Sequence, residues 1–143
     1  MNTHKLTLTV LPETFAVCRF DKHEAIPNWV TQQSFVSITR TEDELSIVCP
    51  QTEVPPDVPE MREDTNKTRP VVEKNWRCFK VAGPLDFALT GIMASLVGPL
   101  AHAGITVFAI STYETDYLMV RATSLDHAIR VLKLAEHDIV STP

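Results

Sequence analysis

The chain has 143 residues, of which 44% are hydrophobic and 22% are charged, and its formal net charge is -5. This composition is typical of a globular protein, and the length fits one ordinary domain or two small ones. The acidic balance and the lack of a basic stripe argue against a nucleic-acid surface. The longest apolar stretch is interrupted by Gly, Pro and Ser, which argues against a membrane span. The first residues lack the pattern of a signal peptide, so we expect a cytoplasmic protein.

The first third of the chain predicts mainly strands. Apolar runs at residues 6–11 and 15–20 flank Pro12-Glu13-Thr14, which predicts either a hairpin or two strands with a tight corner. One short helix is expected at residues 26–30, with Pro27 in its first turn. Strands follow at residues 35–40 and 45–49. Residues 50–70 contain five prolines and predict an extended linker, with a mobile charged part at residues 60–69.

The stretch from residue 77 to residue 122 predicts strand, helix, strand, strand. Its helix, expected at residues 86–103, has apolar residues at helical spacing and ends before Gly104, a residue suited to a left-handed C′ position. Pro99 predicts a kink, because it removes a helical N–H and crowds the Ser95 carbonyl. Strands are expected at residues 105–112 and 117–122. A second helix is expected at residues 124–138, with Ser124 as its N-cap.

The first of these helices carries small residues opposite its leucines, namely Gly91, Ala94, Ser95 and Gly98. Such a stripe lets another backbone or a ligand approach closely. Tight packing against a neighbouring segment and ligand binding both explain it.

Residues 36–48 and 108–120 align without a gap at an offset of 72 residues, which places Thr39 on Ser111 and Glu44 on Asp116. Both segments are strand, polar turn, strand. We interpret them as a duplicated unit, although two hairpins of similar composition can also match by chance.

The remaining motifs argue against catalysis. Cys18, Cys49 and Cys78 are far apart, form no CxxC pair, and are expected to be reduced and buried in strands. The five histidines supply no clustered metal ligands. Nucleophile, phosphate-binding and metalloprotease motifs are missing from the sequence. We therefore expect no enzyme activity, no metal and no cofactor.

Strand, helix, strand, strand, helix is the order of the ACT domain, a small regulatory module. Residues 91–120, with Pro-Leu-Ala-x-Ala-Gly-Ile followed by Ile-Ser-Thr-Tyr-x-Thr-Asp-Tyr, resemble tandem ACT proteins. These include stand-alone microbial proteins related to the regulatory regions of aspartate kinases, and the CASTOR-type arginine sensors. The resemblance implies an α+β fold of two ferredoxin-like βαββαβ units, with antiparallel sheets and helices on one face. The expected domains are a degenerate N-terminal unit at residues 1–65, including the Pro-rich linker, and a C-terminal ACT domain at residues 66–143.

The resemblance also implies a free amino acid as ligand, bound at the interface of the two ACT units. One wall of the site is the helix start and the other is a polar strand end; the residues carried over are Leu89, Thr90, Gly91, Ile92, Ser111, Thr112, Tyr113 and Asp116. Helix N–H groups suit a carboxylate, and Asp116 suits an ammonium or guanidinium group. Asp116 can instead only shape its turn, and Ser111 and Thr112 can only satisfy backbone groups.

Two functional hypotheses follow. The first is a regulatory amino-acid-binding protein, and the second is a ligand-free module that uses the ACT fold for oligomerisation. We expect a homodimer in either case, because sheet edges invite pairing and closed dimers are the commonest solution.

Overall fold

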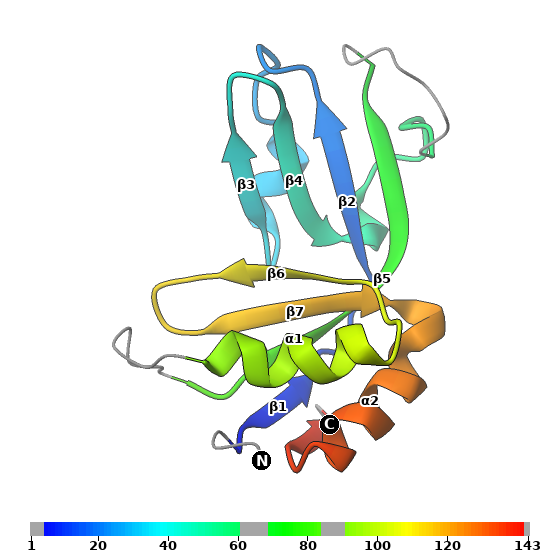
Figure 1. Ribbon diagram of the computed structural model, residues 1–143. Helices are drawn as coiled ribbons and strands as arrows, with labels where there is room; N and C mark the ends of the chain where they lie inside the picture. The colour runs from blue at the N-terminus through cyan, green and yellow to red at the C-terminus, as the bar shows by residue number, and fades with distance from the viewer. Residues whose placement is uncertain (1–4, 61–68, 84–90, 142–143) are drawn as a thin grey trace. The chain divides into compact units, whose positions relative to one another are not determined.

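A computed structural model describes residues 5–60, 69–83 and 91–141 of the protein (Figure 1). The chain divides into two compact units. The split unit consists of residues 1–12 and 76–143, and the inserted unit consists of residues 13–75. The expected boundary between residues 65 and 66 lies outside the described residues. Among the helices of the described ranges, none is long and apolar enough to cross a membrane.

The split unit is a sheet with two helices on one face. Its strands are β1 (Thr7–Val10), β5 (Val71–Val81, from Trp76 onward), β6 (Val107–Ser111), β7 (Asp116–Arg121) and β8 (Asp138–Ser141), in the order β8-β1-β5-β7-β6. Helix α1 (Ile92–His102) connects β5 to β6, and the 3-10 turn η3 (Ala122–Ser124) leads into α2 (Leu125–Leu134). From β5 onward the order is βαββαβ, which confirms the expected ferredoxin-like fold.

The N-terminal strand lies inside this arrangement. Strand β1 is antiparallel to β5 and parallel to β8, with Leu8 opposite both Val81 and Ile139. The hairpin interpretation of the first two apolar runs is therefore wrong, because β1 pairs with β5 and β8 instead of with β2. The β1–β8 pair is the one parallel pairing in an otherwise antiparallel sheet of described strands.

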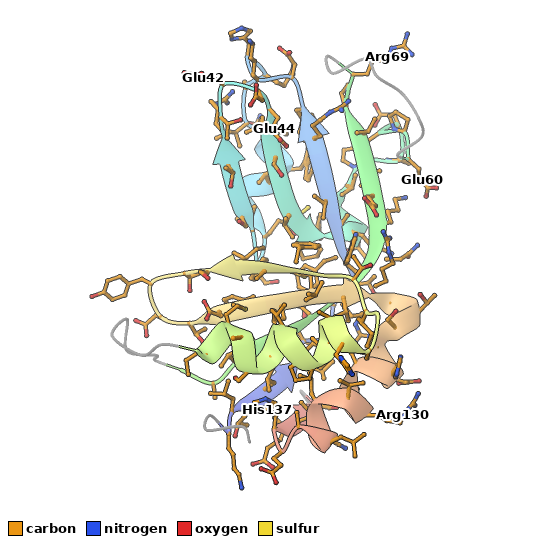
Figure 2. The ribbon with its side chains drawn as sticks, viewed as in Figure 1. Glu42, Glu44, Glu60, Arg69, Arg130 and His137 are labelled. Carbon is orange, nitrogen blue, oxygen red and sulfur yellow. The ribbon has the colours of Figure 1, made fainter. Side chains whose placement is uncertain are left out.

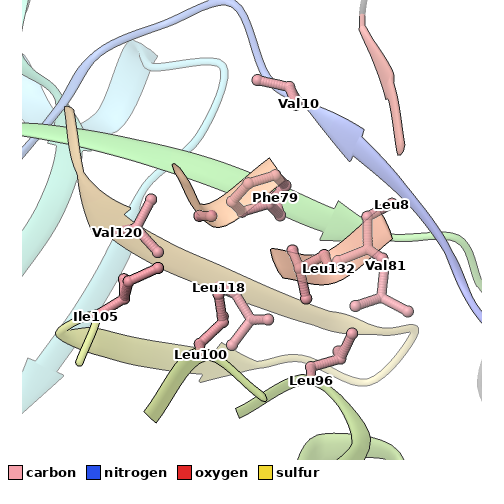
Figure 3. Close-up of a cluster of buried hydrophobic side chains, with 11 residues drawn as sticks. Leu8, Val10, Phe79, Val81, Leu96, Leu100, Ile105, Leu118, Val120 and Leu132 are labelled. Carbon is pink, nitrogen blue, oxygen red and sulfur yellow. The ribbon is translucent and has the colours of Figure 1, made fainter. Parts of the chain in front are cut away.

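The core of the split unit lies between the sheet and its helices (Figure 3). Strand side chains alternate between faces, so Phe79 and Val81 share a face with Leu118 and Val120. The buried members of this core are Leu8, Val10, Phe79, Val81, Leu96, Leu100, Ile105, Leu118, Val120, Ala128 and Leu132. Leu96 and Leu100 come from the predicted apolar stripe of α1, and Ala128 and Leu132 come from that of α2.

The start of α1 and the end of α2 differ from prediction. Gly91 has a left-handed φ of 79° and precedes α1, so the helix cannot run through it as expected. Helix α2 ends at Leu134, because Glu136 is left-handed with φ of 72° and the chain then forms β8, a strand that the sequence reading missed. A side chain added at Gly98 would meet nothing within 4 Å, so no tight packing explains that glycine among the described residues.

The inserted unit has strands in the order β3-β4-β2-β5, namely β3 (Ser37–Arg40), β4 (Leu45–Pro50), β2 (Phe15–Phe20) and the first part of β5. The described residues of this unit form two 3-10 turns, η1 (Asn28–Gln32) and η2 (Gln51–Glu53), and no α-helix. Its core includes Val30 from η1 and Val54 after η2. Residues 50–60 are thus part of this unit rather than a free linker, since Val54 packs against the strands. Residues 61–68 lie outside the described range.

The three cysteines form no disulfide and are buried, as predicted. Cys18 on β2 and Cys49 on β4 lie on the same face of the inserted unit, because Cys18 pairs with Ile47 and Ala16 with Cys49. A hydrogen bond with Cys49 lowers the pKa of Cys18. The same bond, together with burial, raises the pKa of Cys49.

Two equivalent hairpins confirm the repeat but correct its offset. In each unit a four-residue turn is closed from its first N–H to its last carbonyl, Thr41 to Glu44 at 2.9 Å and Thr112 to Thr115 at 2.8 Å. The strands flank these turns with the pairs Arg40–Leu45 and Ser111–Asp116. Thr112 therefore corresponds to Thr41, at an offset of 71 rather than 72.

This correction of one residue matters because adjacent strand residues point to opposite faces. At the corrected offset Ser111 corresponds to Arg40 rather than Thr39. Asp116 corresponds to the fully buried Leu45 rather than to Glu44.

Both α-helices end in the same hydrogen-bonded motif. After α1, Gly104 N–H donates to the Ala101 carbonyl and Ile105 N–H to that of Leu100. After α2, Glu136 N–H donates to the Lys133 carbonyl and His137 N–H to that of Leu132. These are the two bonds of a Schellman motif, whose left-handed position favours glycine. Gly104 meets this preference and Glu136 does not.

The first prediction concerns that left-handed position. Glu136→Gly should raise the free energy of unfolding by about 0.5–1 kcal/mol, because it relieves backbone strain. Gly104→Ala should lower it by about 1 kcal/mol for the converse reason. Urea denaturation of both variants measures the effects. Destabilisation by Glu136→Gly would show that the exposed Glu136–Lys5 ion pair, at 3.7 Å, outweighs the strain.

The second prediction tests whether the N-terminal strand contributes to the core of the split unit. Leu8 is fully buried on β1, so Leu8→Ala should cost about 2–5 kcal/mol of stability. The control is Leu134→Ala on α2, where the leucine is 85% exposed and the cost should stay within about 0.5 kcal/mol. Equal losses in urea denaturation of the two variants would contradict the placement of β1.

Candidate functional site

The start of α1 offers backbone donors that have no acceptor within the helix. Ser95 N–H makes the first helical hydrogen bond, to the Gly91 carbonyl at 3.0 Å. The N–H groups of Ile92, Met93 and Ala94 precede that bond and have no acceptor within the helix. Among the described residues, no side-chain cap hydrogen bond is seen at this end of the helix. Such a terminus attracts a carboxylate through its N–H groups and its positive dipole end.

The β6–β7 turn is fixed by its own threonines. Thr112 Oγ1 donates to the Thr115 carbonyl at 3.0 Å and accepts from Thr115 N–H at 3.3 Å. Thr115, which is buried, donates from Oγ1 to the Val81 carbonyl at 2.6 Å. The Thr112 hydroxyl is therefore engaged in the turn, which favours a structural role for that side chain.

Gly83 brings the exit of β5 against the same turn. A Cβ at this position would lie 2.9 Å from the Glu114 carbonyl oxygen and 3.0 Å from Thr115 Cβ, so only glycine fits. The described chain after β5 therefore lies against the turn at Gly83. Sequence reasoning missed Thr115 and this contact of Gly83, although threonines at both ends of a four-residue turn were a readable signal.

Asp116 and Ser111 face the side of the sheet that α1 covers. They form a cross-strand pair, and Asp116 lies two residues before Leu118, whose side chain packs in the core beneath the helices. Asp116 is half-buried and Ser111 exposed. Within the described residues the Asp116 carboxylate has no hydrogen bond or ion pair, so an interaction of Asp116 with its own turn is not seen.

The predicted site residues are thus placed as follows. Gly91 and Ile92 lie at the start of α1, and Figure 1 shows this helix start and the β6–β7 turn at the same end of the split unit. Ser111 and Asp116 lie opposite each other where the strands end. Tyr113 is 82% exposed at the tip of the turn. Leu89 and Thr90 lie outside the described residues.

The described residues contain no group of three or more His, Cys, Asp or Glu side chains that could hold a metal ion. An open depression of about 650 Å³ lies elsewhere in the split unit, beside β8. Its lining residues are Thr7, Lys133, Glu136, His137, Asp138, Ile139 and Val140.

Two family models match parts of this chain. Residues 71–133 match the family model of the ACT domain, and residues 13–57 match a model described as an N-terminal domain. The human cytosolic arginine sensor for mTORC1 subunit 1 is 36% identical over 67 residues, which are 46% of this chain and 20% of the sensor. The match therefore spans about a fifth of that relative's length.

Two solved structures extend the likeness over the whole chain. Protein Atu0741 from Agobacterium tumefaciens is 36% identical, with a TM-score of 0.85 over 99% of this chain and 96% of that one. The ligand-free regulatory subunit of aspartate kinase from Thermus thermophilus has a TM-score of 0.60 at 10% identity, over 90% of this chain and 95% of the subunit. The second likeness shows a shared fold alone. The chain therefore contains an ACT domain and belongs, together with Atu0741, to a family of ACT-domain proteins with the fold of aspartate kinase regulatory subunits.

Proposed function

We propose that this protein is a non-catalytic regulatory protein that binds a free amino acid where α1 begins. The observation that carries the proposal is Asp116. In the inserted unit the corresponding position holds the buried Leu45, which fills the core. In the split unit the same position holds the half-buried carboxylate of Asp116, which has no partner among the described residues. A carboxylate in a position that the fold otherwise fills with leucine calls for a cationic partner.

A free amino acid supplies the matching charges. Its carboxylate suits the N–H groups of Ile92, Met93 and Ala94 at the positive end of α1. Its ammonium group, or a guanidinium on its side chain, suits Asp116 through charge-assisted hydrogen bonds. Gly91 leaves the backbone at the helix start uncovered by a side chain. Leu89, Thr90, Ser111, Thr112 and Tyr113 remain proposed contacts around these two anchors.

The relatives support a regulatory role. One is named as a cytosolic arginine sensor, and another is a regulatory subunit of a kinase rather than its catalytic part. We therefore propose a sensor without catalytic activity, located in the cytoplasm. The alternative, an ACT module that only oligomerises, is an outcome of the tests below.

The third prediction is the ligand itself. A thermal-shift screen of the twenty amino acids at millimolar concentration should identify at least one that raises the melting temperature. Binding to the folded state alone stabilises by about 2.7 kcal/mol at a hundredfold excess over the dissociation constant. Asp116→Asn should weaken that binding about tenfold or more, because a hydrogen bond to a charged group is lost. Gly91→Ala should weaken it too, because a side chain enters the helix start.

Matched controls separate binding from folding. Glu114→Gln removes one exposed carboxylate from the same turn and should leave binding unchanged. Gly104→Ala places the same side chain at the other left-handed glycine flanking α1 and should cost stability without affecting affinity. If no amino acid stabilises the wild type, the sensor proposal fails and the oligomerisation module remains. If binding survives Asp116→Asn unchanged, the proposed location of the site is wrong.

The fourth prediction is a homodimer. Among the described strands, β3 pairs only with β4, and β6 pairs only with β7, so each unit ends in an edge strand. Unpaired edges favour association, and a closed dimer is the commonest result. Light scattering at micromolar concentration should give twice the chain mass of 16.0 kDa. A mass of one chain would reject the dimer.

A further inference from the structure

The strongest unexplained feature of the split unit is His137, which is only 3% exposed. Figure 2 shows it in the split unit, below α1 in that view. Both ring nitrogens contact backbone groups. Nδ1 accepts a hydrogen bond from Leu6 N–H at 3.1 Å, and Nε2 lies 3.0 Å from the Ser95 carbonyl oxygen.

Pro99 explains the second contact. A helical N–H normally donates to the carbonyl four residues earlier, and Pro99 has no N–H to donate to Ser95. The Ser95 carbonyl therefore needs another donor, which the His137 ring supplies. This carbonyl belongs to the first turn of α1, where Ser95 N–H donates to Gly91 and Ser95 Oγ donates to the Ile92 carbonyl at 2.7 Å.

The two contacts fix the protonation state of the ring. A backbone N–H can only donate and a carbonyl can only accept. Nδ1 must therefore be unprotonated, and Nε2 must carry the hydrogen. The imidazole is neutral in this arrangement, and a second proton on Nδ1 would point directly at Leu6 N–H.

Leu6 is the point where the N-terminal strand attaches to the end of the chain. Its N–H donates to His137, and its carbonyl accepts from Asp138 N–H at 2.9 Å. The parallel pairing of β1 with β8 begins at the next residue, with Thr7 opposite Asp138. Loss of the bond to His137 therefore releases the start of β1.

Protons can reach this ring, because His137 lines the open depression beside β8. The charged groups around it are exposed and mixed in sign. Lys5 precedes β1, Lys133 lies on α2, and Glu136 and Asp138 flank His137 in sequence. Helix α1 contributes only His102, at its far end, among its described residues. These exposed charges are screened by water.

We propose that His137 is a proton-sensitive latch that joins β1 to the first turn of α1, and that protonation of its ring weakens the attachment of β1. A proton on Nδ1 removes the acceptor for Leu6 N–H, so stability should fall as the pH falls. Histidine is the side chain suited to this response between about pH 5 and pH 8.

The first experiment measures stability by urea denaturation at about pH 8 and about pH 5. In the wild type the folding equilibrium constant should fall about tenfold through loss of one buried hydrogen bond, in addition to any general effect of acid. His137→Asn, whose Oδ1 can accept from Leu6 but does not titrate, should lack that fall. The control His127→Gln removes an exposed histidine of α2 and should behave as wild type. An unchanged pH response in His137→Asn overturns the latch.

The second experiment needs no substitution of the histidine. Long-range nitrogen–proton NMR spectra of the wild type at pH 8 should show His137 with its hydrogen on Nε2, and the protection factor of the Leu6 amide should fall about tenfold on acidification. Hydrogen on Nδ1, or a Leu6 protection factor independent of pH, overturns the proposal. Pro99→Ala restores a helical donor to Ser95, so the cost of His137→Asn should be smaller in that background; equal costs would remove Pro99 from the argument.

Discussion

The split unit depends on the pairing of its first strand, β1, with a neighbouring strand on each side. Strand β1 lies between β5 and β8, so these two strands do not pair with each other directly. Leu8 and Val10 also fill the core beneath the helices. The unit is therefore complete only when two distant parts of the sequence meet. All of the inserted unit lies between these two parts of the sequence.

Local patterns predicted the elements that local physics controls. The apolar stripe of α1, the two hairpins with their polar turns and the buried cysteines follow from periodicity and residue type. The sequence did not reveal β8, because a four-residue strand directly after a helix continues the same apolar pattern. It did not reveal the partners of β1 either, since Val81 lies 73 residues after Leu8, Asp138 lies 131 residues after Thr7, and no local rule selects them. Gly91 was predicted to lie within the helix because the apolar residues around it keep helical spacing.

The candidate site shows a similar division. Ser111 and Asp116 could be predicted as neighbours, because a polar turn between two strands brings its flanking residues together. The residue-by-residue correspondence between the hairpins of the two units could not be determined correctly from the amino-acid sequence alone. Ile38 matches Ile110 and Val48 matches Val120 at an offset of 72, whereas the hydrogen bonds of the turns require 71. Only the corrected register shows that a carboxylate occupies a position held by leucine in the other unit.

The split arrangement has a consequence for synthesis on the ribosome. Residues 13–75 form a contiguous unit that can fold as soon as they leave the exit tunnel, because domains generally fold as units and N-terminal ones first. Strand β1 is made earlier still, yet its parallel partner β8 is translated only after the inserted unit, α1 and α2. The apolar residues of β1 must therefore stay unpaired on one side until β8 has been made. During this interval a nascent chain should be exposed to chaperones through the apolar residues of β1.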